Sequence, residues 1–234
     1  MKKISIIILT LAALVAFCAC GETDIRGEIK NNDVPETSVQ TSADTASAET
    51  EAETVQLEVG ETEGSVYQNS LIGIGYNLEE GWSFYSDEQI NELNNITSDM
   101  LPEEAKKALE DATVVYDMYA KEDDGLNSII INFEKINLLQ TIAIDLLENF
   151  EQLVPTLRST YENMGYTNFT YDICYTAIED ENFASVKLSA EINGISVYQT
   201  MLQKKCGGYL ATISATAYYE DTTGDILDNF FFLK

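Results

Sequence analysis

Aromatic residues divide the chain into two parts that differ in their capacity to form a core. All 13 Tyr, the single Trp and every Phe except Phe17 lie within residues 66–234. The stretch 21–65 is rich in Thr, Ser and Ala and carries twelve acidic side chains against Arg26 and Lys30. Such a stretch cannot bury enough apolar surface to offset the entropy lost on ordering. We therefore expect residues 66–234 to form one globular domain, preceded over residues 20–65 by a disordered acidic tether.

The first nineteen residues have the pattern of a secretory signal. Lys2 and Lys3 precede an apolar run over residues 4–17. This run is shorter than the roughly 20 apolar residues of a membrane-spanning helix. A basic start followed by a short apolar segment is typical of a signal peptide. We therefore expect residues 1–19 to be removed from the mature chain, and an ordinary signal peptide without lipidation is the alternative.

The end of this signal contains two cysteines, Cys18 and Cys20. The pair Ala19-Cys20 resembles the lipobox of bacterial lipoproteins, in which the cysteine thiol receives diacylglycerol before cleavage on its N-terminal side. We favour Cys20, because a small residue precedes it, whereas Phe17 precedes Cys18. The resemblance implies a lipid-anchored protein on the extracytoplasmic face of a bacterial cell membrane, with Cys20 as the lipidated residue.

The charge of the chain and its lack of histidine exclude several functional classes. The formal net charge is -27 at pH 7, and no histidine is present. Without imidazole there is no Ser-His-Asp or Cys-His pair and no His-ligated metal. A strong polyanion is repelled by phosphate backbones, which excludes nucleic acid as a partner. We therefore expect a non-enzymatic protein, with paired carboxylates as the remaining route to catalysis.

The first half of the domain is predicted to contain strands and two helices. Ser86 and Gln89 form a capping box that begins a helix ending near Asn94. Pro102 suits the first turn of a second helix that ends near Asp111. Apolar runs bounded by turn residues predict strands. These strands are expected over residues 72–78, 82–85, 113–120 and 127–136, with a hairpin loop at 121–125.

The second half is predicted to contain one long helix and an antiparallel meander. Apolar residues recur at spacings of three and four from Ile142 onward, and Gly165 supplies a stop. Pro155 is expected to kink this helix or divide it. Asn193-Gly194 is a strong signal for a type I′ hairpin. Four strands are expected over residues 166–178, 183–192, 195–205 and 209–218, followed by a helix over 222–232.

Several of these strands carry apolar residues on both faces, as Ile129-Ile130-Ile131 does. A sheet of this kind needs a covering layer on each side. The sequence therefore predicts the α+β class, as an α/β/α sandwich with a mostly antiparallel sheet and helices on both faces.

Residues 71–85, Leu-Ile-Gly-Ile-Gly-Tyr-Asn-Leu-Glu-Glu-Gly-Trp-Ser-Phe-Tyr, resemble the opening of PsbP-like domains. The expected order of elements after this motif is also similar to theirs. The resemblance implies a PsbP-like fold over residues 66–234, shared with a photosystem extrinsic subunit, a Ran-binding nuclear import factor and many bacterial lipoproteins. Members of this family mostly bind other proteins, and no catalytic set is carried over to this chain.

Few residues are candidates for a site. We interpret Trp82 as a core anchor more readily than as a stacking platform for a ligand. Cys174 and Cys206 are expected on the first and third meander strands, roughly 9 to 10 Å apart if Ile178 faces Phe183. A disulfide needs Cα atoms within about 7 Å, so both are expected to be free thiols.

Two further features allow more than one interpretation. The many tyrosines of the predicted strands either fill a two-sided sheet or line a binding face, and we favour the first. The acidic loops at 122–125 and 179–181 have oxygen ligands for Ca²⁺ but are more readily solvated turns. No catalytic residue, cofactor or metal ligand is therefore predicted.

Together these patterns predict a membrane-anchored lipoprotein whose domain binds an unknown protein or peptide, or serves as an accessory module. A small-molecule or cation-binding lipoprotein is the alternative, and a carboxylate-dependent hydrolase is a weaker one. An exposed aromatic patch would favour a protein partner, and a deep pocket would favour a ligand. Two facing carboxylates in a cleft would favour catalysis.

Overall fold

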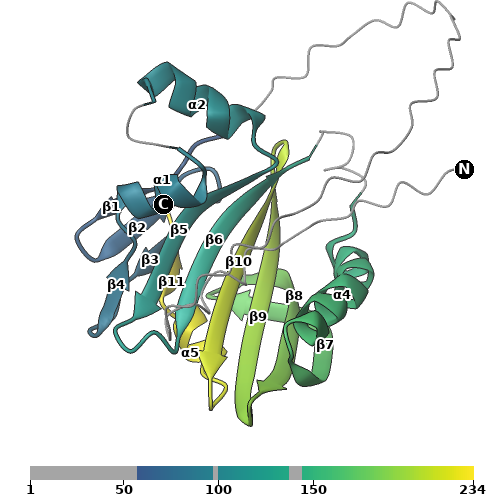
Figure 1. Cartoon of the computed structure of the whole chain (residues 1–234). Coiled ribbons are helices and arrows are strands. Elements are labelled where there is room, and N and C mark those ends of the chain that lie inside the picture. Colours follow the sequence, from purple (N-terminus) through teal and green to yellow (C-terminus); the bar gives the residue numbers. More distant parts are fainter. Residues whose placement is uncertain (1–56, 97–99, 137–143) are drawn as a thin grey trace, which may run out of the picture.

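The main element of the domain is a seven-stranded sheet in which every pair of neighbouring strands is antiparallel (Figure 1). The computed structural model describes residues 57–96, 100–136 and 144–234. In spatial order the strands are β4 (Trp82–Phe84), β5 (Val114–Glu122), β6 (Ser128–Lys135), β10 (Tyr209–Tyr218), β9 (Ile195–Cys206), β8 (Glu181–Ile192) and β7 (Thr167–Ile178). The strands β7 to β10 are neighbours in chain order, which confirms the predicted meander.

The β8–β9 hairpin forms as its sequence predicts. Asn193 and Gly194 have φ values of 52° and 80°, the positive values that a type I′ turn requires. Ile192 pairs with Ile195, so the loop contains two residues. Local turn chemistry therefore fixes this register.

The β7–β8 hairpin is tighter than expected. Ile178 pairs with Glu181, and the predicted pairing with Phe183 is wrong. Glu179 adopts a φ of 46°, which lets the chain reverse within two residues. The strand β8 therefore begins two positions before its predicted start at Phe183.

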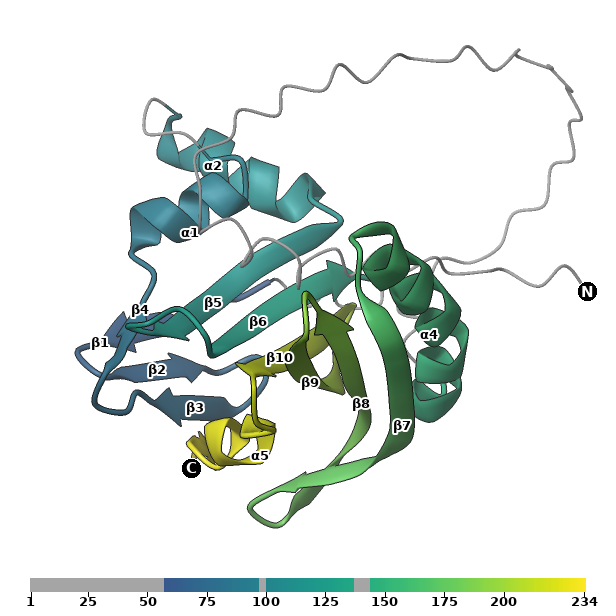
Figure 2. The same cartoon turned by 60° about the horizontal axis from the view of Figure 1, so that its bottom comes forward.

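A second sheet of four strands packs on one face of the main sheet (Figure 2). Its spatial order is β1 (Glu61–Glu63), β2 (Val66–Asn69), β3 (Ile74–Asn77) and β11 (Phe230–Phe232). Tyr67 and Ile74 of this sheet share one core cluster with Ile131 and Ile213 of the main sheet. Strand β1 lies within the stretch expected as tether, so the paired part of the chain begins at Glu61 and not at Val66.

The C-terminal helix is shorter than predicted. The helix α5 (Thr223–Leu227) ends before Phe230, and β11 then pairs with β3. Phe231 lies opposite Gly75, where an added Cβ would come within 2.2 Å of the phenyl ring. Three successive phenylalanines favour an extended chain, and Gly75 leaves room for the central ring. The predicted helix over residues 222–232 is therefore wrong after Leu227.

The long helix α4 (Leu146–Asn163) covers the opposite face of the main sheet, over β7 and β8. Asp145 caps its first turn by accepting hydrogen bonds from two backbone N–H groups. Pro155 is exposed, on the side where water can satisfy the freed carbonyl group, and it does not divide the helix. Ile142, the expected start, lies outside the described residues. Within the described ranges no helix has the length and apolar character needed to cross a bilayer.

The two faces of the main sheet are therefore covered differently. α4 covers one face, and the small sheet with α5 covers the other, where helices had been expected on both. The helices α1 (Asp87–Leu93) and α2 (Pro102–Asp111) lie at the β5 end of the sheet (Figures 1 and 2). The α+β class holds, and the second layer is a sheet because β2, β3 and β11 pair with one another. The capping box of α1 at Ser86 and Gln89 is present as predicted.

Both cysteines of the domain are free thiols. Cys174 lies on β7 and Cys206 on β9, with β8 between them. This strand order agrees with the argument against a disulfide. Cys206 lies at the tip of the β9–β10 hairpin, is 5% exposed and packs into the core shared by the two sheets.

Candidate partner-binding surface

Strand β7 forms one edge of the main sheet and is its most open element. It pairs only with β8, in a continuous register from Thr170 opposite Ser189 to Ile178 opposite Glu181. Beyond β7 the described residues form no further strand of this sheet. A long edge strand presents unpaired backbone groups to which another chain can add.

The tight β7–β8 hairpin determines which backbone groups point outward. In a two-residue loop the flanking pair, here Ile178 and Glu181, exchanges backbone hydrogen bonds across the turn. Backbone groups alternate in direction along a strand. The N–H and C=O groups of Tyr171, Ile173 and Tyr175 therefore point away from β8, toward an added strand.

The same residues carry the exposed aromatic surface of the strand. Tyr175 is 64% exposed and Tyr171 is 49% exposed, on the face that carries α4. Ile173 lies between them and packs against the core under α4. We call Tyr171, Ile173 and Tyr175 the β7 surface. It combines rigid aromatic contacts with free backbone groups, as peptide-binding edges do.

The opposite end of the main sheet is closed. Strand β4 pairs with only the last part of β5, from Ala120 to Glu122. Next to it, the side chain of Asn94 makes two hydrogen bonds to the backbone of Tyr116. Side-chain groups thus occupy the backbone positions that another strand would need. Within the part of the chain that the structure describes, the β7 end presents the longer open edge of the two.

A cavity of about 300 Å³ adjoins Tyr175 at the start of α4. Glu181, Gln203 and Lys205 are among its lining residues. Gln203 is 1% exposed, its Oε1 accepts a hydrogen bond from Asn149 Nδ2 at 3.0 Å, and its Nε2 has no hydrogen-bond partner among the described residues. Buried amide donors are rarely left unpaired. A carbonyl group of a ligand in the cavity could accept a hydrogen bond from Gln203 Nε2.

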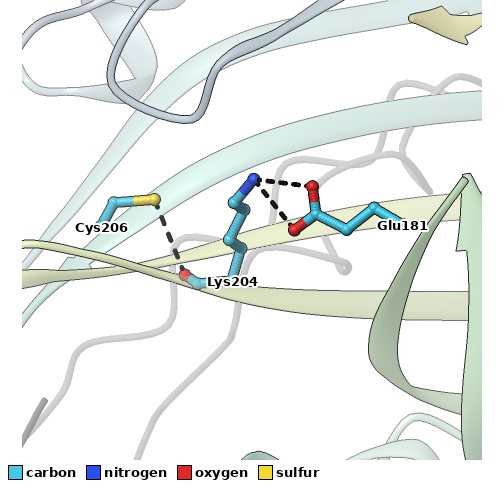
Figure 3. Close-up of polar contacts among 3 residues, drawn as sticks. All are labelled: Glu181, Lys204 and Cys206. Carbon is cyan, nitrogen blue, oxygen red and sulfur yellow. Dashed lines mark hydrogen bonds and ion pairs between the residues drawn. The ribbon is translucent and has the colours of Figure 1, made fainter. Parts of the chain in front are cut away.

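Lys204 and Glu181, which are lining residues of the same cavity, form an ion pair (Figure 3). Lys204 Nζ lies 3.2 Å from Glu181 Oε1 and 5.5 Å from the ring centroids of both Phe183 and Phe232. Cys206 Sγ makes a weak hydrogen bond to the carbonyl group of Lys204. Burial raises the pKa of the Cys206 thiol to about 11. This thiol is therefore a packed group and not an activated nucleophile.

Two buried carboxylates lie elsewhere in the main sheet. Asp117 faces the small sheet, where Tyr67 donates a hydrogen bond to it. Glu134 pairs in register with Leu210, whose side chain belongs to the core under α4, so it lies on the other face. Burial raises the pKa of Glu134 to about 7. Because a sheet separates these two carboxylates, they cannot flank one substrate bond.

The residues singled out from the sequence have different places in the structure. Trp82 is partly buried and packs against the core, as an anchor does. Cys20 lies outside the described residues. In the described ranges, which include both acidic loops, no three His, Cys, Asp or Glu residues are arranged to hold a metal ion. The sequence predicted the strand of the β7 surface but not its place at the sheet edge, which depends on long-range pairing.

No protein-family model and no curated protein matches the sequence. A structure from Bacteroides thetaiotaomicron is similar with a TM-score of 0.36 and 10% identity over 74% of this chain. The chain spans 50% of that protein. LpqN of Mycobacterium tuberculosis, which is involved in cell envelope biogenesis, gives a TM-score of 0.37 and 10% identity over 69% of this chain and 83% of its own. These values assign neither a family nor a function.

Proposed function

We propose that the protein is an extracytoplasmic lipoprotein whose domain binds an extended segment of a protein partner along the β7 surface. The observation that carries the binding role is the open edge of β7, with its two exposed tyrosines. The anchoring role rests on the signal-like start and on Cys20. A PsbP-like fold belongs to the same proposal, supported by the motif at residues 71–85 and by the order of elements.

The chemistry of the edge defines the partner segment. An added strand would bond to the outward backbone groups of Tyr171, Ile173 and Tyr175, and its apolar side chains would contact the two rings. On the opposite face of β7, Asp172 is exposed. The domain carries 28 acidic and 9 basic residues over 66–234. A segment that alternates apolar and basic residues is complementary to this surface.

A second copy of the chain is a poorer partner. Two β7 strands could pair across a two-fold axis, but each domain has a net charge of -19, from 9 basic minus 28 acidic residues. Long-range repulsion between two such domains opposes their association. A different protein with a basic surface would be attracted by the negative charge of the domain. The partner is therefore expected to be another envelope protein.

The tether gives the domain its reach. The acidic tether predicted from the sequence, as a flexible coil, would have a root-mean-square span of roughly 40 Å, which its own acidic charges would extend. The β7 surface can therefore meet partners above the lipid headgroups. The domain then acts as an accessory module that a lipid anchor keeps at the membrane.

Photocrosslinking in cells tests this proposal. A photoreactive phenylalanine analogue replaces Tyr175 in the full chain, and the control places it at Tyr219, which is 57% exposed and lies after β10. We expect a discrete crosslinked protein from position 175 and none from position 219. The same products from both positions, or none from either, would reject the β7 surface as the binding site.

A further inference from the structure

A second site lies at the other end of the main sheet, in a cavity of about 530 Å³. It is bounded by the segment that contains β1, by α1 and by the half of β5 that β4 does not cover. This volume is typical of sites for small molecules. We call it the Asp117 cavity, after the buried carboxylate that lines it. It is separate from the β7 surface, because β5 and β7 are separated by four strands of the sheet.

A β-bulge places Asp117 in this position. The register of β5 against β6 shifts between Tyr116 and Met118, which leaves Asp117 as the extra residue. Its side chain then turns toward the small sheet, where Tyr67 and Asn69 hydrogen-bond to it. The bulge is therefore a local device that presents one carboxylate to the cavity.

Among the described residues, the hydrogen-bond donors to the Asp117 carboxylate are neutral groups. Oδ1 accepts from the Gly60 N–H at 2.7 Å, and Oδ2 accepts from the Tyr67 hydroxyl and from Asn69 Nδ2 at 2.8 Å. The side chain is 9% exposed. No described Lys or Arg forms an ion pair with it. Burial raises the pKa of Asp117, although the hydrogen bonds oppose this rise. A buried carboxylate is stabilised by a nearby positive charge, so a cation in the cavity would gain from Asp117.

The walls of the cavity have the chemistry that holds an organic cation. Four aromatic residues line it: Phe84 lies on the face of the sheet that carries Asp117, and Tyr85, Tyr116 and Tyr119 lie on the other face, so the cavity extends around the uncovered edge of β5. Two further acids, Glu61 and Asp87, are also lining residues, whereas no lining residue is basic. Lys121 is not a lining residue, but its Nζ lies 5.8 Å from the centroid of the Tyr85 ring. This ring therefore already contacts one cationic group. Aromatic faces with a nearby carboxylate attract ammonium groups.

An inorganic ion fits the site less well. Calcium needs six to eight oxygen ligands, and the described residues contain no group of three acids arranged to hold a metal. The oxygens of Asp117 are already used by three neutral donors. An ammonium ion needs only charge and a few contacts, and aromatic rings supply these contacts without displacing the donors.

We propose that the Asp117 cavity binds a small organic cation of the alkylammonium class, with Asp117 as its counter-charge and Tyr85 as an aromatic wall. This site gives the protein a ligand-binding role beyond the contact with a protein partner. The two roles are independent, because they use opposite ends of the sheet.

Calorimetric titration of the mature chain carrying Cys20→Ser tests the proposal. The probes are choline, tetramethylammonium and putrescine, with 3,3-dimethylbutanol as the uncharged isostere of choline. We expect at least one cation to bind, and the isostere to bind at least about tenfold more weakly. Equal binding of choline and its isostere, or no binding of any cation at millimolar concentration, would overturn the proposal.

Three variants locate the bound cation within the structure. Asp117→Asn should weaken binding about 30-fold or more, because it removes the counter-charge. Tyr85→Leu leaves that carboxylate in place and should weaken binding about fivefold, whereas Tyr219→Leu should have no effect. If Asp117→Asn fails to fold, the affinity of Tyr85→Leu relative to that of Tyr219→Leu still tests whether the cation binds in this cavity. Equal affinity of these two variants would contradict binding in the Asp117 cavity.

Discussion

The side chain of Asn94 covers one edge of the main sheet, because it forms the two hydrogen bonds with the Tyr116 backbone that a neighbouring strand would otherwise form. Its Nδ2 donates to the Tyr116 carbonyl oxygen at 2.7 Å, and its Oδ1 accepts from the Tyr116 N–H at 2.8 Å. Both bonds reach from the end of α1 to the uncovered half of β5. The other edge, β7, has no such cover in the described chain. This difference between the two ends directs a strand partner to β7.

Replacing this amide should weaken the domain and open the β5 edge. Asn94→Ala removes two partly buried hydrogen bonds, so we expect the free energy of unfolding to fall by about 1–2 kcal/mol. Urea unfolding measures the loss, and hydrogen exchange at the Tyr116 amide should accelerate. Asn91→Ala, one turn earlier in α1, is the control. An unchanged Tyr116 amide in the Asn94 variant would show that the bonds do not protect this edge.

Burial of Glu134 predicts a dependence of stability on pH. Its pKa rises from 4.5 to about 7 in the folded chain, so the folded chain holds this proton more tightly than the unfolded chain. The free energy of unfolding should therefore fall as the pH increases between these values. Glu134→Gln removes this contribution. From acid to mildly alkaline pH, the free energy of unfolding of the wild type should therefore fall by up to about 3 kcal/mol relative to that of the variant.

Denaturant unfolding across this pH range tests the prediction, with Glu151→Gln on the exposed side of α4 as the matched control. The control should follow the wild-type curve. Parallel curves for Glu134→Gln and the wild type would mean that Glu134 does not titrate in this window.

The two free thiols should differ in reactivity. Cys206 is 5% exposed and has a pKa of about 11, whereas Cys174 is partly exposed on the edge strand. Thiolate is the reactive form, so Cys206 should react more slowly at neutral pH. Iodoacetamide labelling of the unreduced mature chain, followed by peptide mass measurement, determines both rates. Loss of labelling at both sites without prior reduction would instead indicate a disulfide.

Local signals in the sequence predicted the parts of the fold that local chemistry decides. Ser86 with Gln89, Pro102 and Asn193-Gly194 each act within a few residues, and each marks the predicted element. The prediction of a helix over residues 222–232 is wrong after Leu227, because β11 pairs with the distant strand β3, where Phe231 lies opposite Gly75. The three phenylalanines favour a strand locally, but the partner strand of β11 cannot be inferred from neighbouring residues.

The candidate sites follow the same rule. The alternation of Tyr171, Ile173 and Tyr175 is visible in the sequence, but the position of β7 at the sheet edge depends on the order of all seven strands. Asp117 looks like an ordinary strand residue until the bulge between Tyr116 and Met118 is known. The sequence could therefore indicate the kind of surface but not its location.

The anchoring role depends on Cys20. Cys20→Ser should move the protein from the membrane fraction to the soluble extracytoplasmic fraction, because acyl chains supply about 0.8 kcal/mol per buried CH₂. Cys18→Ser is the matched control and should stay membrane-bound. Fractionation and immunoblotting of cells measure both. Retention of Cys20→Ser with release of Cys18→Ser would assign the lipid to the other cysteine.

The most direct test of strand addition at β7 compares two substitutions of one residue. Tyr175→Ala and Tyr175→Pro both remove the exposed ring, but only proline also removes the outward N–H group. Because that N–H makes no bond to β8, both variants should fold, which circular dichroism and thermal melting can verify. The affinity of each is then measured by calorimetry against the protein crosslinked through position 175. We predict that Tyr175→Ala binds weakly and that Tyr175→Pro does not bind. Equal affinity of the two variants would contradict binding through the β7 backbone.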